Sequence, residues 1–143
     1  MPPFRLAVIA AAMLSSVQAA QAETPAPAPA LAVELNAAET AEGACTLSFL
    51  ITNDLSADLD QAVFETVLFD QEGTVERLTL FDFGALPQGR PRVRQFVLPQ
   101  TDCTGLSRIL FNGAETCSGP GIAAGECADR LQLTTRTDIE VLG

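Results

Sequence analysis

The chain has 143 residues, and its 18 acidic and eight basic side chains give a formal net charge of −10. It contains no histidine, tryptophan or tyrosine, and every basic residue is an arginine. These absences exclude catalytic triads and zinc or haem sites that need histidine, and they exclude reactions that need a lysine. The acidic balance argues against a nucleic-acid partner and against an anionic membrane surface.

Residues 1–22 have the pattern of an export signal. A short head containing Arg5 precedes an apolar run over residues 6–17, which is too short to cross a bilayer as a helix. Residues 20–22 (Ala-Gln-Ala) supply a signal-peptidase pattern, with cleavage after Ala19 as the alternative. Cleavage after residue 22 leaves 121 residues with seven arginines and all 18 acids, a net charge of −11. Because no cysteine lies at the cleavage site, the sequence predicts a periplasmic or secreted protein with no lipid anchor there and no membrane insertion after cleavage.

A linker and one domain follow the signal. Residues 23–30 begin with Glu-Thr and continue as alternating Pro and Ala, which is typical of an extended spacer. From residue 31 to residue 143, short alternating apolar runs are separated by turn residues. The expected strands are 31–36, 44–53, 61–70, 74–83, 92–98, 106–112 and 130–142. Seven short strands predict an all-β fold, a single antiparallel β-sandwich of the immunoglobulin or fibronectin type III kind.

Individual segments add detail to this expectation. The run 44–53 is the clearest strand, with its largest apolar residues at every second position. The run 61–70 is apolar on both faces, which indicates a central strand covered on each side. Residues 71–73 (Gln-Glu-Gly) form a tight turn into a hairpin partner. The Asn112-Gly113 pair predicts a turn that ends the sixth strand and opens a long loop over 113–129.

The middle of the chain carries a pattern of core and turn residues: Leu47, Phe49, Ile51, Asn53, Leu59, Val63, Leu68-Phe69-Asp70, Gly73, Val75, Leu86-Pro87, Gly89 and Phe96. This pattern resembles the FxLYD-type domain, a family of small β-sandwich modules on exported bacterial proteins. The hallmark of the family is Leu-Tyr-Asp before a glycine turn, and here Phe69 stands in the tyrosine position. The resemblance covers about half of the mature chain. It implies a fold and carries over no functional residue.

The four cysteines, Cys45, Cys103, Cys117 and Cys127, form an even set in an exported chain, which predicts structural disulfides. Cys117 and Cys127 flank a glycine-rich loop and are expected to pair, which leaves Cys45 for Cys103. The competing arrangement joins Cys103 to Cys117 and Cys45 to Cys127. No Cys-x-x-Cys motif and no histidine support a redox centre or a metal site.

Three arginines at alternate positions, Arg90, Arg92 and Arg94, project from one face of an extended chain. A ridge of guanidinium groups suits an acidic partner, or a carboxylate or phosphate group. The alternative is neutralisation by acids of the adjacent hairpin strand, such as Glu76 or Asp82. If this strand lies at a sheet edge, it offers an unknown protein partner a site for strand addition.

Asp54, Asp58 and Asp60 lie in one predicted loop and suggest calcium, although the glycine and glutamate of an EF-hand loop are missing. The alternative is a solvated loop whose aspartates bond the backbone. No catalytic residue and no cofactor are expected. The sequence therefore predicts a non-catalytic, disulfide-stabilised binding or accessory module. The alternative is a calcium- or small-ligand-binding exported protein that uses the Asp54–Asp60 loop.

Overall fold

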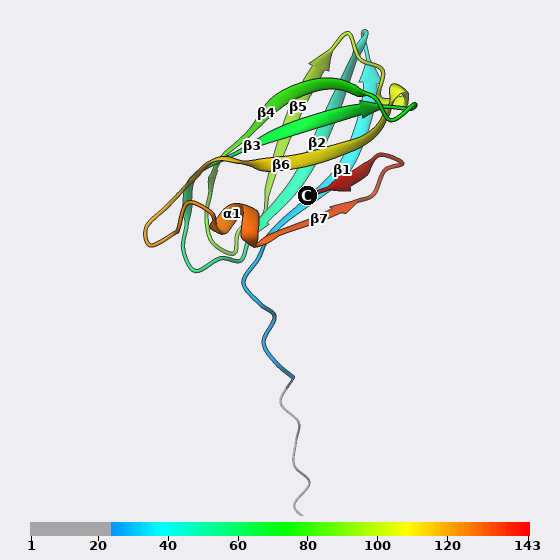
Figure 1. Ribbon diagram of the computed structural model, residues 1–143. Helices are drawn as coiled ribbons and strands as arrows, with labels where there is room; N and C mark the ends of the chain where they lie inside the picture. Colours follow the sequence, from blue (N-terminus) through cyan, green and yellow to red (C-terminus); the bar gives the residue numbers. More distant parts are fainter. Residues whose placement is uncertain (1–23) are drawn as a thin grey trace, which may run out of the picture.

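The computed structural model describes residues 24–143, so the predicted export signal lies outside the described residues. Eight strands form two four-stranded sheets that pack face to face as a β-sandwich (Figure 1). Sheet A has the order β5 (Arg92–Pro99), β2 (Ala44–Asn53), β1 (Leu31–Ala41), β7 (Leu131–Thr135). Sheet B has the order β4 (Val75–Leu86), β3 (Leu59–Asp70), β6 (Leu106–Ser118), β8 (Glu140–Leu142).

The strands follow the two-residue period of the sequence. Along β2, every second residue from Cys45 to Asn53 is buried, and the residues between them are partly exposed. In the β3–β4 hairpin, the Asp70 carboxylate accepts hydrogen bonds from the backbone N–H groups of Glu72 and Thr74 at 3.0 and 2.8 Å. Gly73 has φ 79°, a conformation that other residues rarely adopt. The predicted tight turn at 71–73 is confirmed.

The core between the sheets is built on phenylalanine. Six rings contact one another with centroids 4.3–6.5 Å apart, and most pairs meet edge to face or tilted. Such aromatic pairs stabilise a core beyond the area that they bury. The cluster contains Phe49, Phe64, Phe81, Phe83, Phe96 and Phe111.

The prediction of seven antiparallel strands is wrong at the C-terminal end. The predicted strand 130–142 is two strands in different sheets: β7 pairs parallel to β1, and β8 pairs parallel to β6. Just after β7, the backbone N–H of Arg136 donates a hydrogen bond to the carbonyl of Leu35 in β1. Ile139 is buried where the chain passes from sheet A to sheet B. Even spacing of apolar residues predicts a strand but carries no information about a change of sheet.

The predicted end of the sixth strand is also wrong. β6 continues past Asn112-Gly113 to Ser118 and stays paired with β3, through register shifts that include one between Glu65 and Thr66. Asn112 has no partner in this register, and Gly113 does not have the positive φ that a type I′ turn requires. The remainder of the predicted loop contains one short helix, α1 (Glu126–Asp129).

The segment before the domain is extended. Residues 24–30 contain no helix or strand, and all of them except Ala30 are exposed. Figure 1 shows them running away from the end of the sandwich that carries α1. No helix among the described residues is long and apolar enough to span a membrane.

Candidate functional site

The arginine ridge lies on an edge strand. β5 is the outer strand of sheet A, and it pairs with β2 rather than with the hairpin strand β4. Arg90 is exposed before the strand, whereas Arg92 and Arg94 are partly buried within it. Arg94 is opposite the buried Phe49, so its side chain lies on the inner face of sheet A. There it faces β4, the edge strand of sheet B.

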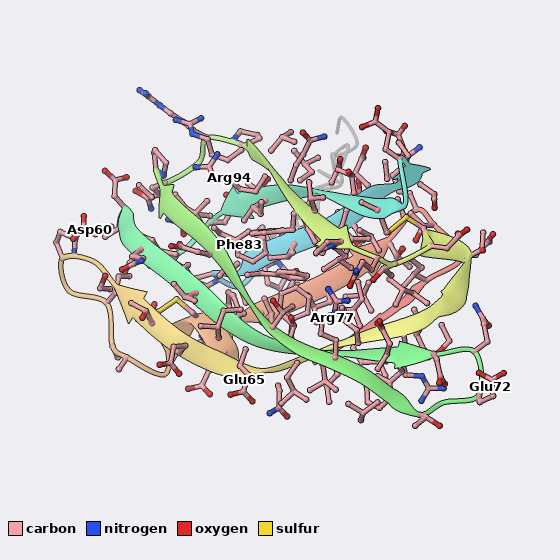
Figure 2. All side chains as sticks on the ribbon, turned by 90° about the horizontal axis from the view of Figure 1, so that it is seen from above. Asp60, Glu65, Glu72, Arg77, Phe83 and Arg94 are labelled. Carbon is pink, nitrogen blue, oxygen red and sulfur yellow. A yellow bond between two sulfur atoms is a disulfide. The ribbon has the colours of Figure 1, made fainter. Side chains whose placement is uncertain are left out.

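Arg94 connects the two sheets. Its Nε donates to the carbonyl of Phe83 at 2.7 Å, and its second guanidinium nitrogen donates to the carbonyl of Ala85 at 3.1 Å. Arg77 of β4 makes the reverse connection, to the carbonyl of Pro99 at 3.1 Å. Figure 2 shows Arg94 and Arg77 at separate points along the side where β4 and β5 face each other. Arg94 therefore holds two edge strands together.

The predicted neutralisation of the ridge by Glu76 or Asp82 is wrong. Among the described residues the ion pairs are Arg77–Glu76 at 3.7 Å and Arg108–Glu140 at 3.6 Å, and neither involves the ridge. The physical reason is the topology, since β5 and β4 belong to different sheets and cannot form cross-strand pairs.

The loop between β2 and β3 holds Asp54 and Asp58 and is organised by the buried Asn53, whereas Asp60 lies in β3. The Asn53 amide donates to the carbonyls of Ala57 and Leu86 at 2.9 and 2.8 Å. Asp58 accepts from the backbone N–H of Gln88 at 2.7 Å, which ties the loop to the segment after β4. Within residues 24–143, no three carboxylate or sulfur side chains come together as a metal site. The calcium hypothesis receives no support from this geometry.

The disulfides join Cys45 to Cys103 and Cys117 to Cys127, which is the favoured pairing. The first links β2 of sheet A to the 3-10 helix η1 (Cys103–Gly105), which leads into β6 of sheet B.

Asp102 is the N-cap residue of η1. Its carboxyl accepts hydrogen bonds from the backbone and the hydroxyl of Thr104 and from the hydroxyl of Thr40, and these bonds lower its pKa.

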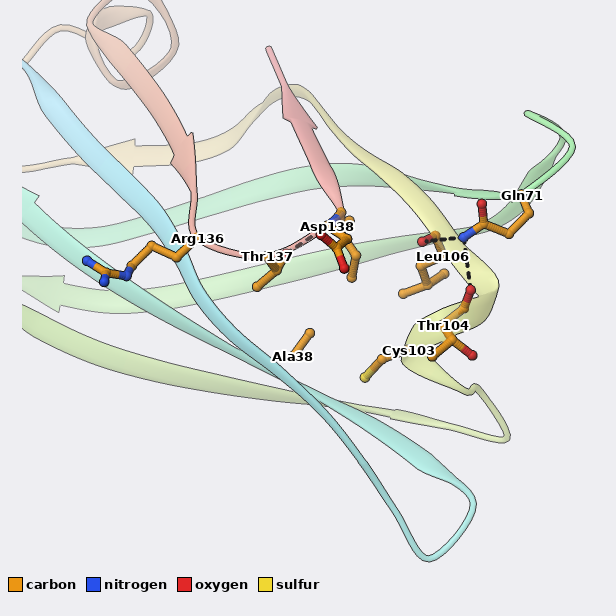
Figure 3. Close-up of a pocket in the computed structure, with 9 residues that line it drawn as sticks. Ala38, Gln71, Cys103, Thr104, Leu106, Arg136, Thr137 and Asp138 are labelled. Atoms are coloured by element: carbon orange, nitrogen blue, oxygen red, sulfur yellow. Dashed lines mark hydrogen bonds between the residues drawn. The ribbon is translucent and has the colours of Figure 1, made fainter.

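A hollow of about 390 Å³ lies between η1 and the β7–β8 connection (Figure 3). Its polar groups bond the protein itself: the Gln71 amide donates to the carbonyls of Thr104 and Leu106 at 2.9 and 3.1 Å. Figure 3 shows the Arg136 side chain directed away from the other lining residues. Asp138 is the acidic residue of this lining.

The outer face of sheet B carries a continuous line of apolar side chains. Leu78 is opposite Val67, Val67 is opposite Leu110, and Leu110 is opposite Leu142. We call these four residues the aliphatic row; it crosses all four strands of the sheet. Leu78 is 62% exposed and Leu142 is 36% exposed. Val67 is 8% exposed and Leu110 is partly exposed, so the exposed members lie at the two ends of the row. Apolar patches on a protein surface often mark a binding site.

Further apolar residues extend the row along the strands. Leu80 is opposite Glu65 and is 54% exposed, and Val75 is opposite Phe69 and is 50% exposed. Figure 2 shows Glu65 on the opposite side of sheet B from the core residue Phe83. This outer face is the strongest candidate for a functional site in the described part of the chain.

The sequence carried a signal for this face. The run 61–70 was expected to be covered on each side, and only one cover is present among the described residues, namely sheet A. On the outer face of sheet B, Val63 and Val67 of β3 are 6% and 8% exposed. On the same face, Leu78 and Leu80 of β4 are exposed to solvent. β3 is a central strand of sheet B, as predicted, and residues on both of its faces are buried, although among the described residues only sheet A packs against it as a layer.

A scan of protein-family models found no match to this chain, and searches of curated proteins and of solved structures found none either. The fold and the surface define a disulfide-bonded β-sandwich with one apolar outer face.

Proposed function

We propose that this protein is an exported, non-catalytic binding module that contacts a protein partner through the outer face of sheet B. The aliphatic row is the observation that carries the proposal. A partner that covers Leu78 and Leu142 would remove apolar surface from water, at roughly 25 cal/mol for each Å².

Export is part of the proposal. Two disulfides indicate an oxidising environment outside the cytoplasm. The predicted signal of residues 1–22 and the exposed Pro/Ala segment support release into the periplasm or the medium. The net charge of −10 supports a partner that is neither a nucleic acid nor an anionic membrane. The absence of histidine and lysine from the sequence supports a role without catalysis or cofactor.

We further propose that the domain is a variant of the immunoglobulin or fibronectin type III sandwich. In support, β1, β2 and β5 form one sheet, while β3 pairs with β4 and β6 in the other, as strands A, B, E and C, C′, F do in such folds. The parallel strands β7 and β8 are the departure. The resemblance to FxLYD-type modules is consistent with this description.

Contact through a sheet face replaces the strand addition at β5 that the arginine pattern suggested. Arg94 and Arg77 occupy the side on which a strand added to β4 or β5 would lie.

The test is site-specific photo-crosslinking in cells that make the protein naturally. A photoreactive side chain at Leu78 is compared with the same side chain at Val97, which is equally exposed at 62% on sheet A. We expect a discrete protein adduct from position 78 and none from position 97. No adduct from position 78, or an equal adduct from both positions, would overturn the proposal.

A further inference from the structure

We propose that the partner contacts the aliphatic row with an amphipathic helix whose apolar side is bordered by lysine or arginine side chains. This inference rests on the proposed binding role and adds the chemistry of the partner. It comes from the shape of the outer face of sheet B and from the charges around it.

The shape suits a helix. The aliphatic row crosses four strands, which places its ends roughly 14 Å apart at the usual strand spacing of about 4.8 Å. A helix with its side chains is about 10–12 Å in diameter, so one apolar helix side covers the row. Helix on sheet is also a common way for a protein to bury the apolar face of a sheet.

The charges specify the border. Glu65 and Asp82 lie beside the row on β3 and β4, and Asp82 is opposite Val63. Glu65 accepts a hydrogen bond from the Asn112 amide. Asp82 accepts hydrogen bonds from the backbone N–H of Gly84 at 2.8 Å and from the Gln61 amide at 3.2 Å. Neither carboxylate pairs with a cation of the described chain. Both are therefore available to lysine or arginine side chains of a partner.

Arg108, the cation on this face within the described chain, lies beside a carboxylate of the same chain but makes no hydrogen bond through its Nε. The Arg108 guanidinium lies 5.7 Å from the centre of the Phe69 ring, and its Nε is 3.6 Å from a Glu140 carboxylate oxygen. A partner with acidic side chains would therefore meet Glu65 and Asp82 with no free positive charge to compensate them.

A second copy of this chain fits less well. Packing two outer faces of sheet B together would bring Glu65 and Asp82 of one copy close to the same carboxylates of the other. Each copy also carries the full net charge of −10, or −11 once the predicted signal is removed. Like charges that face each other across an interface oppose association.

The experiment uses the purified, disulfide-bonded protein and three synthetic helical peptides of equal length. The first has leucine on one side bordered by lysine. The second has glutamate in place of every lysine, and the third has serine in place of every leucine. Fluorescence anisotropy of the labelled peptides at moderate salt measures each dissociation constant. Sedimentation of the protein alone reports whether it forms dimers.

We expect the leucine–lysine peptide to bind more tightly than either of the others by at least about tenfold. The double variant Leu78→Ser/Leu80→Ser should lose at least about tenfold in affinity, and Glu65→Gln/Asp82→Asn about fivefold. The matched control Val93→Ser/Val97→Ser, on the outer face of sheet A, should stay within about twofold of the parent protein.

The contrary results are distinct. Equal binding of the lysine and glutamate peptides would overturn the basic border and leave the apolar contact of the proposed function standing. If Val93→Ser/Val97→Ser lost as much peptide affinity as Leu78→Ser/Leu80→Ser, the assignment of the binding surface to sheet B would be overturned. Binding of none of the peptides, or a dimer that Leu78→Ser/Leu80→Ser dissociates, would overturn the helix partner.

Discussion

The two sheets present different outer faces to water. In sheet B the row across the strands reads Leu78, Val67, Leu110, Leu142, and every member is apolar. The equivalent row in sheet A reads Val93, Leu50, Glu34, Thr134, and the apolar residues stop halfway across.

Exposure alone does not distinguish the faces. Val93 and Val97 of sheet A are 59% and 62% exposed, as much as Leu78 of sheet B. Between them, however, the Gln95 amide donates to the Ser48 hydroxyl at 2.9 Å, so a polar pair separates the two valines. Single exposed apolar residues are normal on protein surfaces, whereas a larger apolar patch indicates contact. The comparison teaches that the cross-strand register, more than the number of exposed apolar residues, marks the candidate site.

The largest expected effect separates the inner face of sheet B from its outer face. Phe64 is fully buried against Phe83 and Phe111, so Phe64→Ala should lower the free energy of unfolding by about 3–5 kcal/mol. Leu78→Ser removes a side chain that is 62% exposed and should change it by less than about 0.5 kcal/mol. Urea unfolding measures both. A large loss for Leu78→Ser would mean that the row is part of the folding core.

The second effect concerns how the two sheets are joined. Loss of the Cys45–Cys103 disulfide, which closes a loop of 58 residues, should cost about 4 kcal/mol in Cys45→Ala/Cys103→Ala. Loss of Cys117–Cys127, which closes a loop of 10 residues, should cost about 3 kcal/mol in Cys117→Ala/Cys127→Ala. Thermal and urea unfolding measure which of the two double variants loses more stability. A larger loss from the second pair would contradict the assignment of Cys45–Cys103 as the main link between the sheets.

A smaller effect tests whether the arginine ridge is structural. Arg94→Gln removes the charged donors to the carbonyls of Phe83 and Ala85, which should cost about 1 kcal/mol of unfolding free energy. The exposed Arg90 is the matched control, and Arg90→Gln should change stability by less than about 0.5 kcal/mol. Equal unfolding free energies of the two variants would contradict a structural role for Arg94 and would leave its side chain available to a partner.

The smallest effect concerns the connection from sheet A to sheet B. The folded protein lowers the pKa of the Asp102 carboxyl through hydrogen bonds from Thr104 and Thr40, so ionised Asp102 favours the folded state. This contribution is present above the pKa of the unfolded chain and is lost as the pH falls through the lower folded value. The parent protein should therefore lose more stability than Asp102→Asn on acidification below about pH 4. Identical acid dependence of the two proteins would contradict this role.

The sequence predicted the parts of the fold that depend on local pattern. The strand cores from 31–36 to 106–112 are present because a two-residue period specifies both a strand and its buried side. The predicted strand 130–142 divides between two sheets, and β6 continues past Asn112-Gly113, because pairing with distant strands decides both outcomes. Local residues do not encode those partners.

The candidate site was only half visible in the sequence. The double-sided apolar pattern of 61–70 predicted a central strand, which is present, but it did not predict that the neighbouring strand β4 would expose apolar side chains on the same outer face. Leu78, Leu110 and Leu142 come together only through the strand order of sheet B, and 64 residues separate the first from the last. The arginine ridge was visible as a pattern, yet its position across from β4 depends on how the sheets pack.

The most direct test of the central claim maps the contact on the protein itself. Two-dimensional NMR spectra of the isotopically labelled protein are recorded while the leucine–lysine peptide is added. We predict that the largest shifts fall on the amides of Val67, Leu78 and Leu110, while those of Leu50, Val93 and Val97 stay in place. Shifts concentrated on β5, or spread equally over both outer faces, would contradict the account.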